Sequence, residues 1–262
     1  MHPPPATSSD PAPDHVKPYV QDTLTTRALH FSMSELQSRM DLRDPDALDL
    51  EYTRLMMGFL LFVPAPTHLA MIGLGGGSLA KFCHKHLARS QVCVVEINPH
   101  VIALREAFKI PPDGPRFQIL QADGAAFVRQ PPQRFEVLLV DGFDYDGLPE
   151  DLSSQRFYDG CAEAISPGGV MVANLHLGHA QYAQQLERIR RSFAGAVLAV
   201  ADSDGSNAIV FACTGDALVA PPKPLNGPLR RPKALSAAGW KPLQTPFARI
   251  ASALRLETGQ DA

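Results

Sequence analysis

Three carboxylates stand close together in the stretch LLVDGFDYDG, at Asp141, Asp144 and Asp146. Because an apolar run precedes Asp141, we expect that residue to end a buried strand and to reach the carboxyl edge of a sheet, where open α/β folds bind ligands. Clustered carboxylates attract cationic amines, and one of them can accept the proton of an ammonium group before the amine attacks. A solvated acidic loop is the alternative, and the apolar run favours a functional site.

A glycine-rich turn and an acidic residue follow in the order expected of a nucleotide site. Gly73, Gly75, Gly76 and Gly77 come after the apolar run LAMI, and such a turn lets backbone N–H groups approach a ligand closely. Glu96 ends the next apolar run, VCVVEI, from which a carboxylate can bind both hydroxyls of a ribose. A tight turn without a ligand would explain the glycines alone, whereas the glycines and Glu96 together favour an adenosine-type ligand.

Asp123 ends a third apolar run, in the stretch QADGAAF. An acidic residue there suits an adenine amino group, and it is equally suited to cap the helix that is expected to start at Gly124; one side chain could do both. No arginine and no second glycine fingerprint supports a cofactor rich in phosphate. The sequence therefore favours an adenosyl sulfonium compound over a dinucleotide.

The elements that position these residues follow from the alternation of apolar runs and amphipathic stretches in the middle of the chain. This alternation predicts an α/β fold, a doubly wound, mostly parallel sheet with helices on both faces. The last two runs, AVLAVAD and NAIVFAC, are separated only by SDGS, so we expect a hairpin with an antiparallel final strand. About five β–α units that close with such a pair match the Rossmann-like arrangement of the class I S-adenosylmethionine-dependent transferases.

The rest of the chain suggests a division into four parts. Residues 1–18 are rich in Pro, Ser and Ala, which predicts a disordered tail. Residues 19–62 are expected to form a small β-hairpin element around 23–42, followed by a helix over 46–62. Residues 63–215 form the predicted Rossmann-like catalytic domain. Residues 216–262 are expected to form a proline-rich strap over 220–245 and a short helix over 246–256.

Composition excludes several classes of protein. The net charge of -3 and the absence of a basic run argue against nucleic acid, and no apolar run is long enough to span a membrane. The first residues lack the pattern of a signal peptide, so we expect a cytoplasmic protein. Four widely separated cysteines predict reduced core thiols. The histidine pairs in CHKH and NLHLGH lack further ligands at metal spacing, so no metal is expected.

The order of these motifs resembles the polyamine aminopropyltransferases, the spermidine synthase family, over roughly residues 29–215. After the glycine turn, Glu96 and the pair Asp123-Gly124, the family's D-x-x-D pattern is matched by Asp141 and Asp144. The glycine, leucine and aromatic pair that follow in the family are matched by Gly147, Leu152, Phe157 and Tyr158. Upstream, Gln37 in LQSRM stands at the place of a ligand-facing glutamine, and Tyr52 falls close to the family's substrate-site tyrosine.

The resemblance implies transfer of an aminopropyl group from decarboxylated S-adenosylmethionine to a polyamine acceptor such as putrescine, which leaves methylthioadenosine. It implies that Asp141 and Asp144 are the catalytic carboxylates and that they bind the acceptor together with Tyr52. A homodimer is compatible with the resemblance. The residues that it implies for donor binding are Gly73, Gly75, Gly77, Glu96, Asp123, Gly124 and Gln37.

Two positions depart from the family pattern. Gly76 stands where the turn of family members carries an aspartate, and Thr53-Arg54 follows Tyr52 where a His or Gln and then a Glu are usual. The first change favours an alternative in which intact S-adenosylmethionine is the donor and a methyl group is transferred. A member of the family that binds ligands without catalysis is a second alternative, against which Asp141 and Asp144 argue.

Overall fold

The computed structural model of the chain describes residues 15–32, 36–142, 149–218 and 228–258. The tail predicted over residues 1–18 lies largely outside these ranges. Asp144, Asp146 and Gly147, which the sequence placed in the acidic stretch, also lie outside the described residues.

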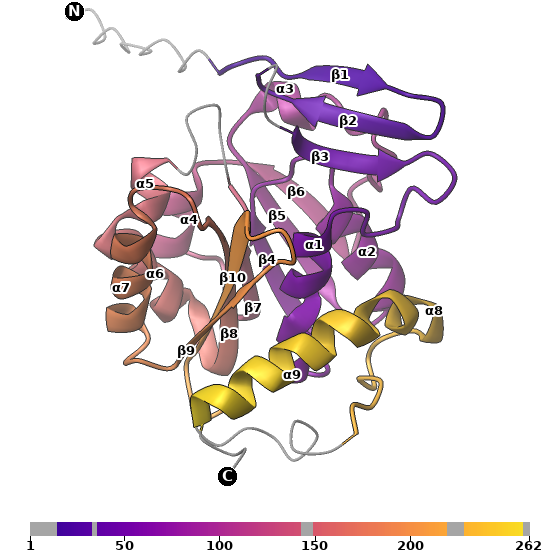
Figure 1. Cartoon of the computed structure of the whole chain (residues 1–262). Helices are drawn as coiled ribbons and strands as arrows, with labels where there is room; N and C mark the ends of the chain where they lie inside the picture. The colour runs from indigo at the N-terminus through magenta and orange to yellow at the C-terminus, as the bar shows by residue number, and fades with distance from the viewer. Residues whose placement is uncertain (1–14, 33–35, 143–148, 219–227, 259–262) are drawn as a thin grey trace, which may run out of the picture.

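A seven-stranded sheet forms the centre of the molecule, with the strand order β6-β5-β4-β7-β8-β10-β9 (Figure 1). The strands β4 to β8 pair in parallel, and β10 runs antiparallel to both β8 and β9. The predicted doubly wound sheet with an antiparallel final strand is therefore confirmed. The strands are β4 (His68–Ile72), β5 (Gln91–Glu96), β6 (Phe117–Gln121), β7 (Phe135–Val140), β8 (Ile165–His176), β9 (Val197–Ala201) and β10 (Asn207–Cys213).

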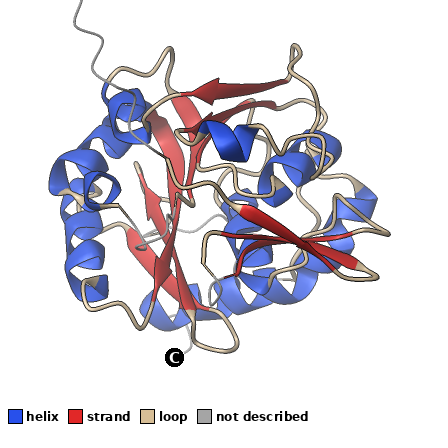
Figure 2. Cartoon of the chain, turned by 90° about the horizontal axis from the view of Figure 1, so that it is seen from above, coloured by secondary structure: helices blue, strands red, loops and turns tan. Residues whose placement is uncertain are grey.

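Helices cover both faces of this sheet because its strands are apolar on both sides. In β4, Leu69 and Met71 enter one buried cluster, while Ala70 and Ile72 enter the other, as the two-residue period of a strand requires. Figure 2 shows the helices on either side of the strands. One face carries α2 (Ser78–His86) and α3 (Pro99–Ile102), and the other carries α4 (Gly124–Arg129), α5 (Glu150–Ser153), α6 (Gln155–Ala164) and α7 (Tyr182–Ser192).

The N-terminal element is an antiparallel sheet of three strands, β1 (Tyr19–Asp22), β2 (Thr26–His30) and β3 (Leu36–Asp41). The expected hairpin thus carries one more strand, β1. The helix predicted over 46–62 begins later, as α1 (Glu51–Met56), and continues as the 3-10 helix η1 (Met57–Leu61). Residues 44–47 form a turn instead, closed by the bond from the N–H of Ala47 to the carbonyl of Asp44.

The C-terminal part contains more regular structure than the expected strap. It holds α8 (Ala237–Trp240), the 3-10 helix η3 (Lys241–Leu243) and α9 (Gln244–Thr258), which packs on β9, α1 and η1. A Cβ on Gly58 would lie 2.3 Å from Ile250 Cδ1, so this glycine lets η1 and α9 pack closely. Residues 219–227 lie outside the described part of the chain.

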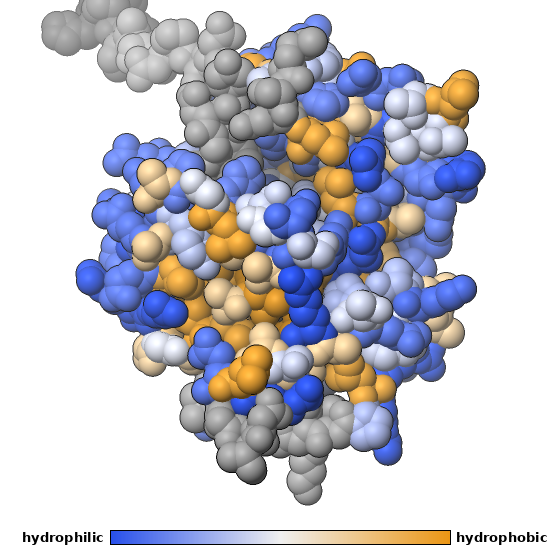
Figure 3. Space-filling view, in the orientation of Figure 1, coloured by the Kyte–Doolittle hydropathy of each residue, from blue (hydrophilic) through white to orange (hydrophobic). Residues whose placement is uncertain are grey.

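Two further features concern the surface and the cysteines. On the face shown in Figure 3, apolar side chains gather over the region of β9 and β10, where Val197 and Ala199 of the edge strand are half-buried. None of the helices in the described ranges is long and apolar enough to cross a membrane. All four cysteines are free thiols, and three of them are buried, as expected of core residues.

Candidate active site

A cavity of about 1140 Å³ lies at the carboxyl ends of the central strands, below the small N-terminal sheet. Its wall is formed by the β4–α2 turn, the ends of β5, β7 and β8, the β6–α4 turn, β3, α1 and the β9–β10 turn. Most of the predicted site residues share this one cavity. They are Gln37, Tyr52, Gly73, Gly75, Glu96, Asp123, Gly124 and Asp141.

Gly77 and Asp144 are the two predicted site residues that the structure does not place in the wall. Gly77 adopts a left-handed backbone, with φ at 70°, at the start of α2, so its part is to form the turn. Asp144 falls in a range that the structure does not describe.

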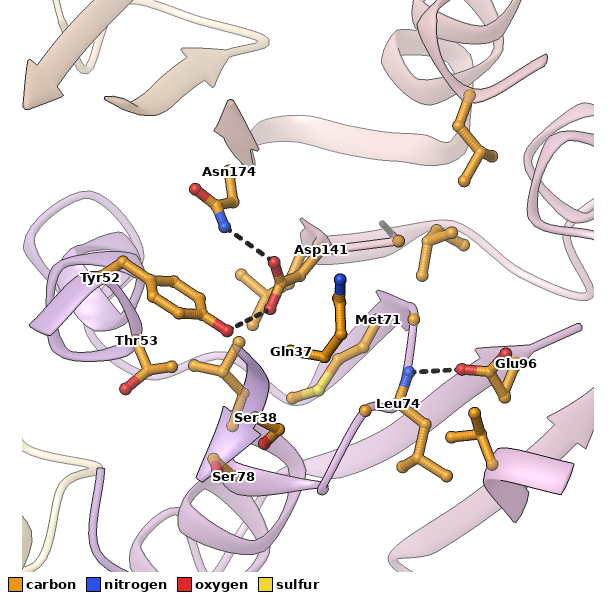
Figure 4. A pocket seen from close by; sticks show the side chains of 18 of the residues that line it. Gln37, Ser38, Tyr52, Thr53, Met71, Leu74, Ser78, Glu96, Asp141 and Asn174 are labelled. Atoms are coloured by element: carbon orange, nitrogen blue, oxygen red, sulfur yellow. Dashed lines mark hydrogen bonds between the residues drawn. The ribbon is translucent and has the colours of Figure 1, made fainter. Parts of the chain in front are cut away.

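Glu96 is buried at one end of the cavity, which we call the nucleoside end. Its Oε2 accepts the N–H of Leu74 at 2.9 Å (Figure 4), and its Oε1 accepts the N–H of Asn98 at 2.8 Å. Burial raises the pKa of this carboxyl group, while the backbone N–H donors oppose the rise. A carboxylate has about four lone-pair sites, so each oxygen can still accept a hydroxyl of a ribose.

Asp123 combines the two roles that the sequence left open. Its Oδ1 accepts the N–H of Ala126 at 2.6 Å and so caps α4. The same side chain lines the cavity, where its other oxygen can accept the amino group of an adenine. A Cβ on Gly124 would lie 2.5 Å from Ile72 Cγ2, so the glycine lets α4 start directly against β4.

The glycine turn brings the nucleoside end next to Asp141. Gly73 has a φ of 96°, and a Cβ there would lie 2.3 Å from the carbonyl oxygen of Asp141. The N–H of Asp141 donates to the carbonyl of Ile72 at 2.9 Å, which completes the contact between the two strand ends. Only glycine allows this close approach without moving backbone atoms.

Gly76 has a different reason to be glycine. A Cβ at this position would lie 2.6 Å from Ser38 Oγ and 2.9 Å from Phe108 Cδ1. The space that a side chain at position 76 would take is thus occupied by β3 and by the segment after α3. Ser38 is buried, and it lines the cavity.

Asp141 is half-buried at the other end of the cavity, which we call the acceptor end. Its Oδ1 accepts the Nδ2 amide of Asn174 at 3.0 Å, and its Oδ2 accepts the hydroxyl of Tyr52 at 3.3 Å (Figure 4). Burial raises the pKa of this carboxyl group, and the two hydrogen bonds partly offset the rise. Burial and the charge of Asp141 together raise the pKa of Tyr52, which keeps its hydroxyl a donor.

Asn174 is a site residue that the sequence analysis missed. It lies in the buried run near the end of β8, is 3% exposed, and lines the cavity beside Asp141. Its Oδ1 is buried and has no hydrogen-bond partner among the described residues. The signal was present in GGVMVANL, because a polar residue ends an apolar run there as it does at Glu96 and Asp141.

Arg54 points away from the acceptor end, although it stands where the family pattern has an acid. Its Nη1 donates to the carbonyls of Leu48 at 2.6 Å and Asp49 at 3.0 Å, in the segment that leads into α1. The guanidinium group therefore stabilises the start of the helix that carries Tyr52.

The charge of the cavity wall is one-sided. Seven acidic residues line it, and the described wall residues include no lysine or arginine. No group of three or more His, Cys, Asp or Glu placed to hold a metal ion occurs in the part of the chain that the structure describes. Such a wall favours a cationic ligand. The acidic residues are Glu51, Glu96, Asp123, Asp141, Asp151, Asp202 and Asp204.

Comparison with known sequences gives one family and close relatives. Residues 49–200 match the family model described as the spermine/spermidine synthase domain. The polyamine aminopropyltransferase of Chromobacterium violaceum is 41% identical over 187 residues, which cover 71% of this chain and 72% of that protein. The polyamine aminopropyltransferase of Neisseria meningitidis serogroup B is 40% identical, with coverage of 70% and 71%.

Comparison with solved structures shows the same fold at low sequence identity. A probable spermidine synthase from Corynebacterium glutamicum has a TM-score of 0.64 at 21% identity and covers 75% of this chain and 76% of its own. Spermidine synthase from Thermotoga maritima has a TM-score of 0.58 at 19% identity, with coverage of 92% and 87%. Human methyltransferase-like protein 13 has a TM-score of 0.58 at 20% identity, with coverage of 78% of this chain and 93% of its own. The fold alone therefore does not distinguish an aminopropyltransferase from a methyltransferase.

Proposed function

We propose the following reaction on the premise that the chain belongs to the spermine/spermidine synthase family and is a polyamine aminopropyltransferase. The donor is decarboxylated S-adenosylmethionine, which the family uses, and the acceptor is a small diamine such as putrescine. The observation that supports this choice best is the place of Asp141 in a cavity wall whose described residues include seven acidic side chains and no lysine or arginine. Both substrates are cations, so the charge of the wall suits both.

The nucleoside end would bind the adenosyl group of the donor. Glu96 would accept the ribose hydroxyls with the lone pairs that its two backbone donors leave free, and Asp123 would accept the adenine amino group. Gln37, on β3, lies between Glu96 and Asp141 in Figure 4 and lines the cavity, so it would contact the donor there. Because Gly73 joins the turn to Asp141, the sulfonium would be held beside the acceptor end.

The transfer itself is a displacement at carbon. The acceptor nitrogen would use its lone pair to form a bond to the aminopropyl carbon attached to sulfur, and the carbon–sulfur bond would break, leaving methylthioadenosine. Asp141 would accept the proton that the attacking ammonium must lose, because its pKa is raised and it stands next to the turn. Holding the two reactants in line supplies much of the remaining rate enhancement.

Tyr52 and Asn174 would orient the Asp141 carboxylate through one oxygen each. Tyr52 would also form part of the acceptor slot, and Asp144 remains a proposed second carboxylate there. A cytoplasmic location, a homodimer and independence of metal ions stay predictions. Turnover after treatment with a chelator would test the last of these.

A product assay tests the proposal. The purified chain, given decarboxylated S-adenosylmethionine and putrescine, is expected to release methylthioadenosine and a triamine in equal amounts, as followed by chromatography and mass spectrometry. Folded protein that binds methylthioadenosine but forms no triamine would contradict the proposed reaction.

The donor is tested separately, because no acidic side chain stands at position 76. Replacing the donor by S-adenosylmethionine and searching for methylated amine would detect methyl transfer. Methylated product without triamine would favour that alternative over aminopropyl transfer.

A further inference from the structure

The C-terminal helix reaches the acceptor end of the cavity through one side chain, Arg249. Its Nη1 donates to Glu51 Oε1 at 3.0 Å, and its Nη2 donates to the carbonyl of Asp202 at 2.9 Å. Glu51 and Asp202 line the cavity, and Arg249 stands behind them on α9. In Figure 1, α9 crosses the molecule directly below α1. Arg249 therefore joins two parts of the cavity wall from outside.

The same two parts are joined and stiffened by further bonds. Ser203 Oγ donates to Glu51 Oε2, the carboxylate oxygen that Arg249 leaves free. The carboxylate of Asp202 accepts the N–H of Asn207 at 3.0 Å and its side-chain amide at 2.7 Å, which closes the turn between β9 and β10. We call the bonds of Arg249, Glu51, Ser203 and Asp202 the α9 latch.

Both side chains that hold Asp141 are linked to the parts of the wall that the latch connects. Tyr52 is the second residue of α1, next to the latch. Asn174 lies two residues before the end of β8, and the N–H of Leu177, just beyond that end, donates to the carbonyl of Ser206 in the β9–β10 turn at 3.0 Å. A shift of α1 against this turn would therefore move the donors of the Asp141 carboxylate.

The ion pair of the latch is too exposed to contribute much to the stability of the fold. The side chains of Arg249 and Glu51 are 39% and 32% exposed, and ion pairs at that exposure contribute little to the free energy of folding. What Arg249 does supply is geometry, since its planar group can donate to two acceptors in fixed directions.

We propose that Arg249 is a positioning residue for the acceptor amine: it fixes α1 against the β9–β10 turn and so sets the width and shape of the acceptor end. The inference rests on the proposed function for the identity of the ligand. It assigns a role in substrate binding to a helix that follows the part of the chain matched by the family model.

Amine binding by Arg249→Met tests this role without requiring turnover. The full-length protein is saturated with methylthioadenosine and titrated with putrescine in a calorimeter. We expect the dissociation constant for putrescine to rise about tenfold in Arg249→Met and that for methylthioadenosine to stay within about twofold. The dissociation constant of Arg249→Lys for putrescine should lie between those of the wild type and Arg249→Met, because an ammonium group keeps the charge and loses the planar, two-donor geometry.

Arg105→Met is the matched control, because Arg105 also donates to one carboxylate, of Asp113, and one carbonyl, of Pro111, and does not line the cavity. Its variant should bind putrescine as the wild type does. The positioning role is refuted if Arg249→Met and Arg105→Met bind putrescine equally well. It is also refuted if Arg249→Met weakens the binding of methylthioadenosine as much as the binding of putrescine.

Hydrogen exchange on the ligand-free protein separates this inference from the proposed function. Arg249→Met is expected to speed exchange in α1 and in the turn at residues 202–206, and Arg105→Met is not. Unchanged exchange in both segments would overturn the latch. Failure of the wild type to form triamine would contradict only the reaction.

Discussion

The two ends of the cavity hold their carboxylates in different ways. At the nucleoside end, Glu96 and Asp123 accept backbone N–H groups from the turns around them. At the acceptor end, Asp141 accepts hydrogen bonds from side chains on two distant parts of the chain, Tyr52 on α1 and Asn174 on β8. The first end is therefore an outcome of backbone geometry, and the second depends on individual side chains.

This difference teaches where the chemistry can be adjusted. Backbone donors are present whatever residue carries them, so they suit a binding task that must stay constant. Side-chain donors can be removed one at a time, and each changes the proton affinity of the carboxylate that it contacts. We therefore expect substitutions at the nucleoside end to change affinity and those at the acceptor end to change rate and pH dependence.

The largest effect should come from removing the acidic group at the acceptor end. In Asp141→Asn, kcat should fall by about 10²- to 10⁴-fold, because the attacking ammonium loses its proton acceptor. Steady-state product assays measure this fall. The affinity for methylthioadenosine should stay unchanged, and a parallel loss of that affinity would show that the two ends are not separable.

The same variant should be more stable than the wild type near neutral pH. Burial raises the pKa of Asp141 in the folded state, so the contribution of this group to stability is present at low pH and is lost as the pH rises through the folded-state pKa. Asparagine removes the buried charge, and thermal unfolding at pH 7 should show a higher Tm for Asp141→Asn. At a pH below the pKa of the unfolded chain the difference should shrink.

At the nucleoside end, Glu96→Gln should lower the affinity for methylthioadenosine by about 10- to 100-fold. Charge-assisted hydrogen bonds are lost, and one backbone N–H then faces an amide NH2 group. Calorimetry gives the affinity. Glu136→Gln is the control, since Glu136 also accepts two backbone N–H groups, those of Thr67 and His68, and does not line the cavity. It should lower stability and leave ligand affinity intact.

Smaller effects are expected for the two donors of Asp141. Tyr52→Phe and Asn174→Ala should each lower kcat by about three- to tenfold. Each donor lowers the pKa of Asp141, so its removal raises that pKa further and moves the acid limb of the kcat profile to higher pH. A pH profile with an unmoved acid limb would mean that these side chains do not act through Asp141.

The smallest effect should come from Arg54→Met. Because Arg54 donates to the carbonyls of Leu48 and Asp49, its loss should cost about 1 kcal/mol of stability and change the KM for putrescine by less than about twofold. Denaturant unfolding and initial rates check the two expectations. A large change in KM would place this guanidinium group at the acceptor end after all.

The sequence predicted those site residues that are marked by a local pattern, an acidic residue at the end of an apolar run. Glu96, Asp123 and Asp141 each end an apolar run, and parallel strands bring such ends to one edge. Asn174 has the same pattern and was missed because a neutral amide carries no charge to suggest chemistry. The doubly wound sheet was predicted for the same reason, since its strands and helices have clear periods.

The rest depended on contacts between distant segments. Nothing near Gly76 in the chain shows that Ser38 and Phe108 fill the space beside it. The direction of Arg54 and the bond from Arg249 to Glu51 likewise depend on how α1 packs, and no local pattern reports that. The late start of α1 has the same origin, because the turn over residues 44–47 takes the place of the first helical turn.

The acidic wall also has a consequence for the timing of the cycle. A wall whose described residues include seven acidic side chains and no lysine or arginine speeds the approach of cations, and this gain weakens as salt screens the charges. The triamine product carries one more positive charge than the diamine, while methylthioadenosine is neutral. The cavity that draws the substrate in therefore holds the amine product more firmly, so departure of the triamine, and not its formation, is the step that added salt should accelerate.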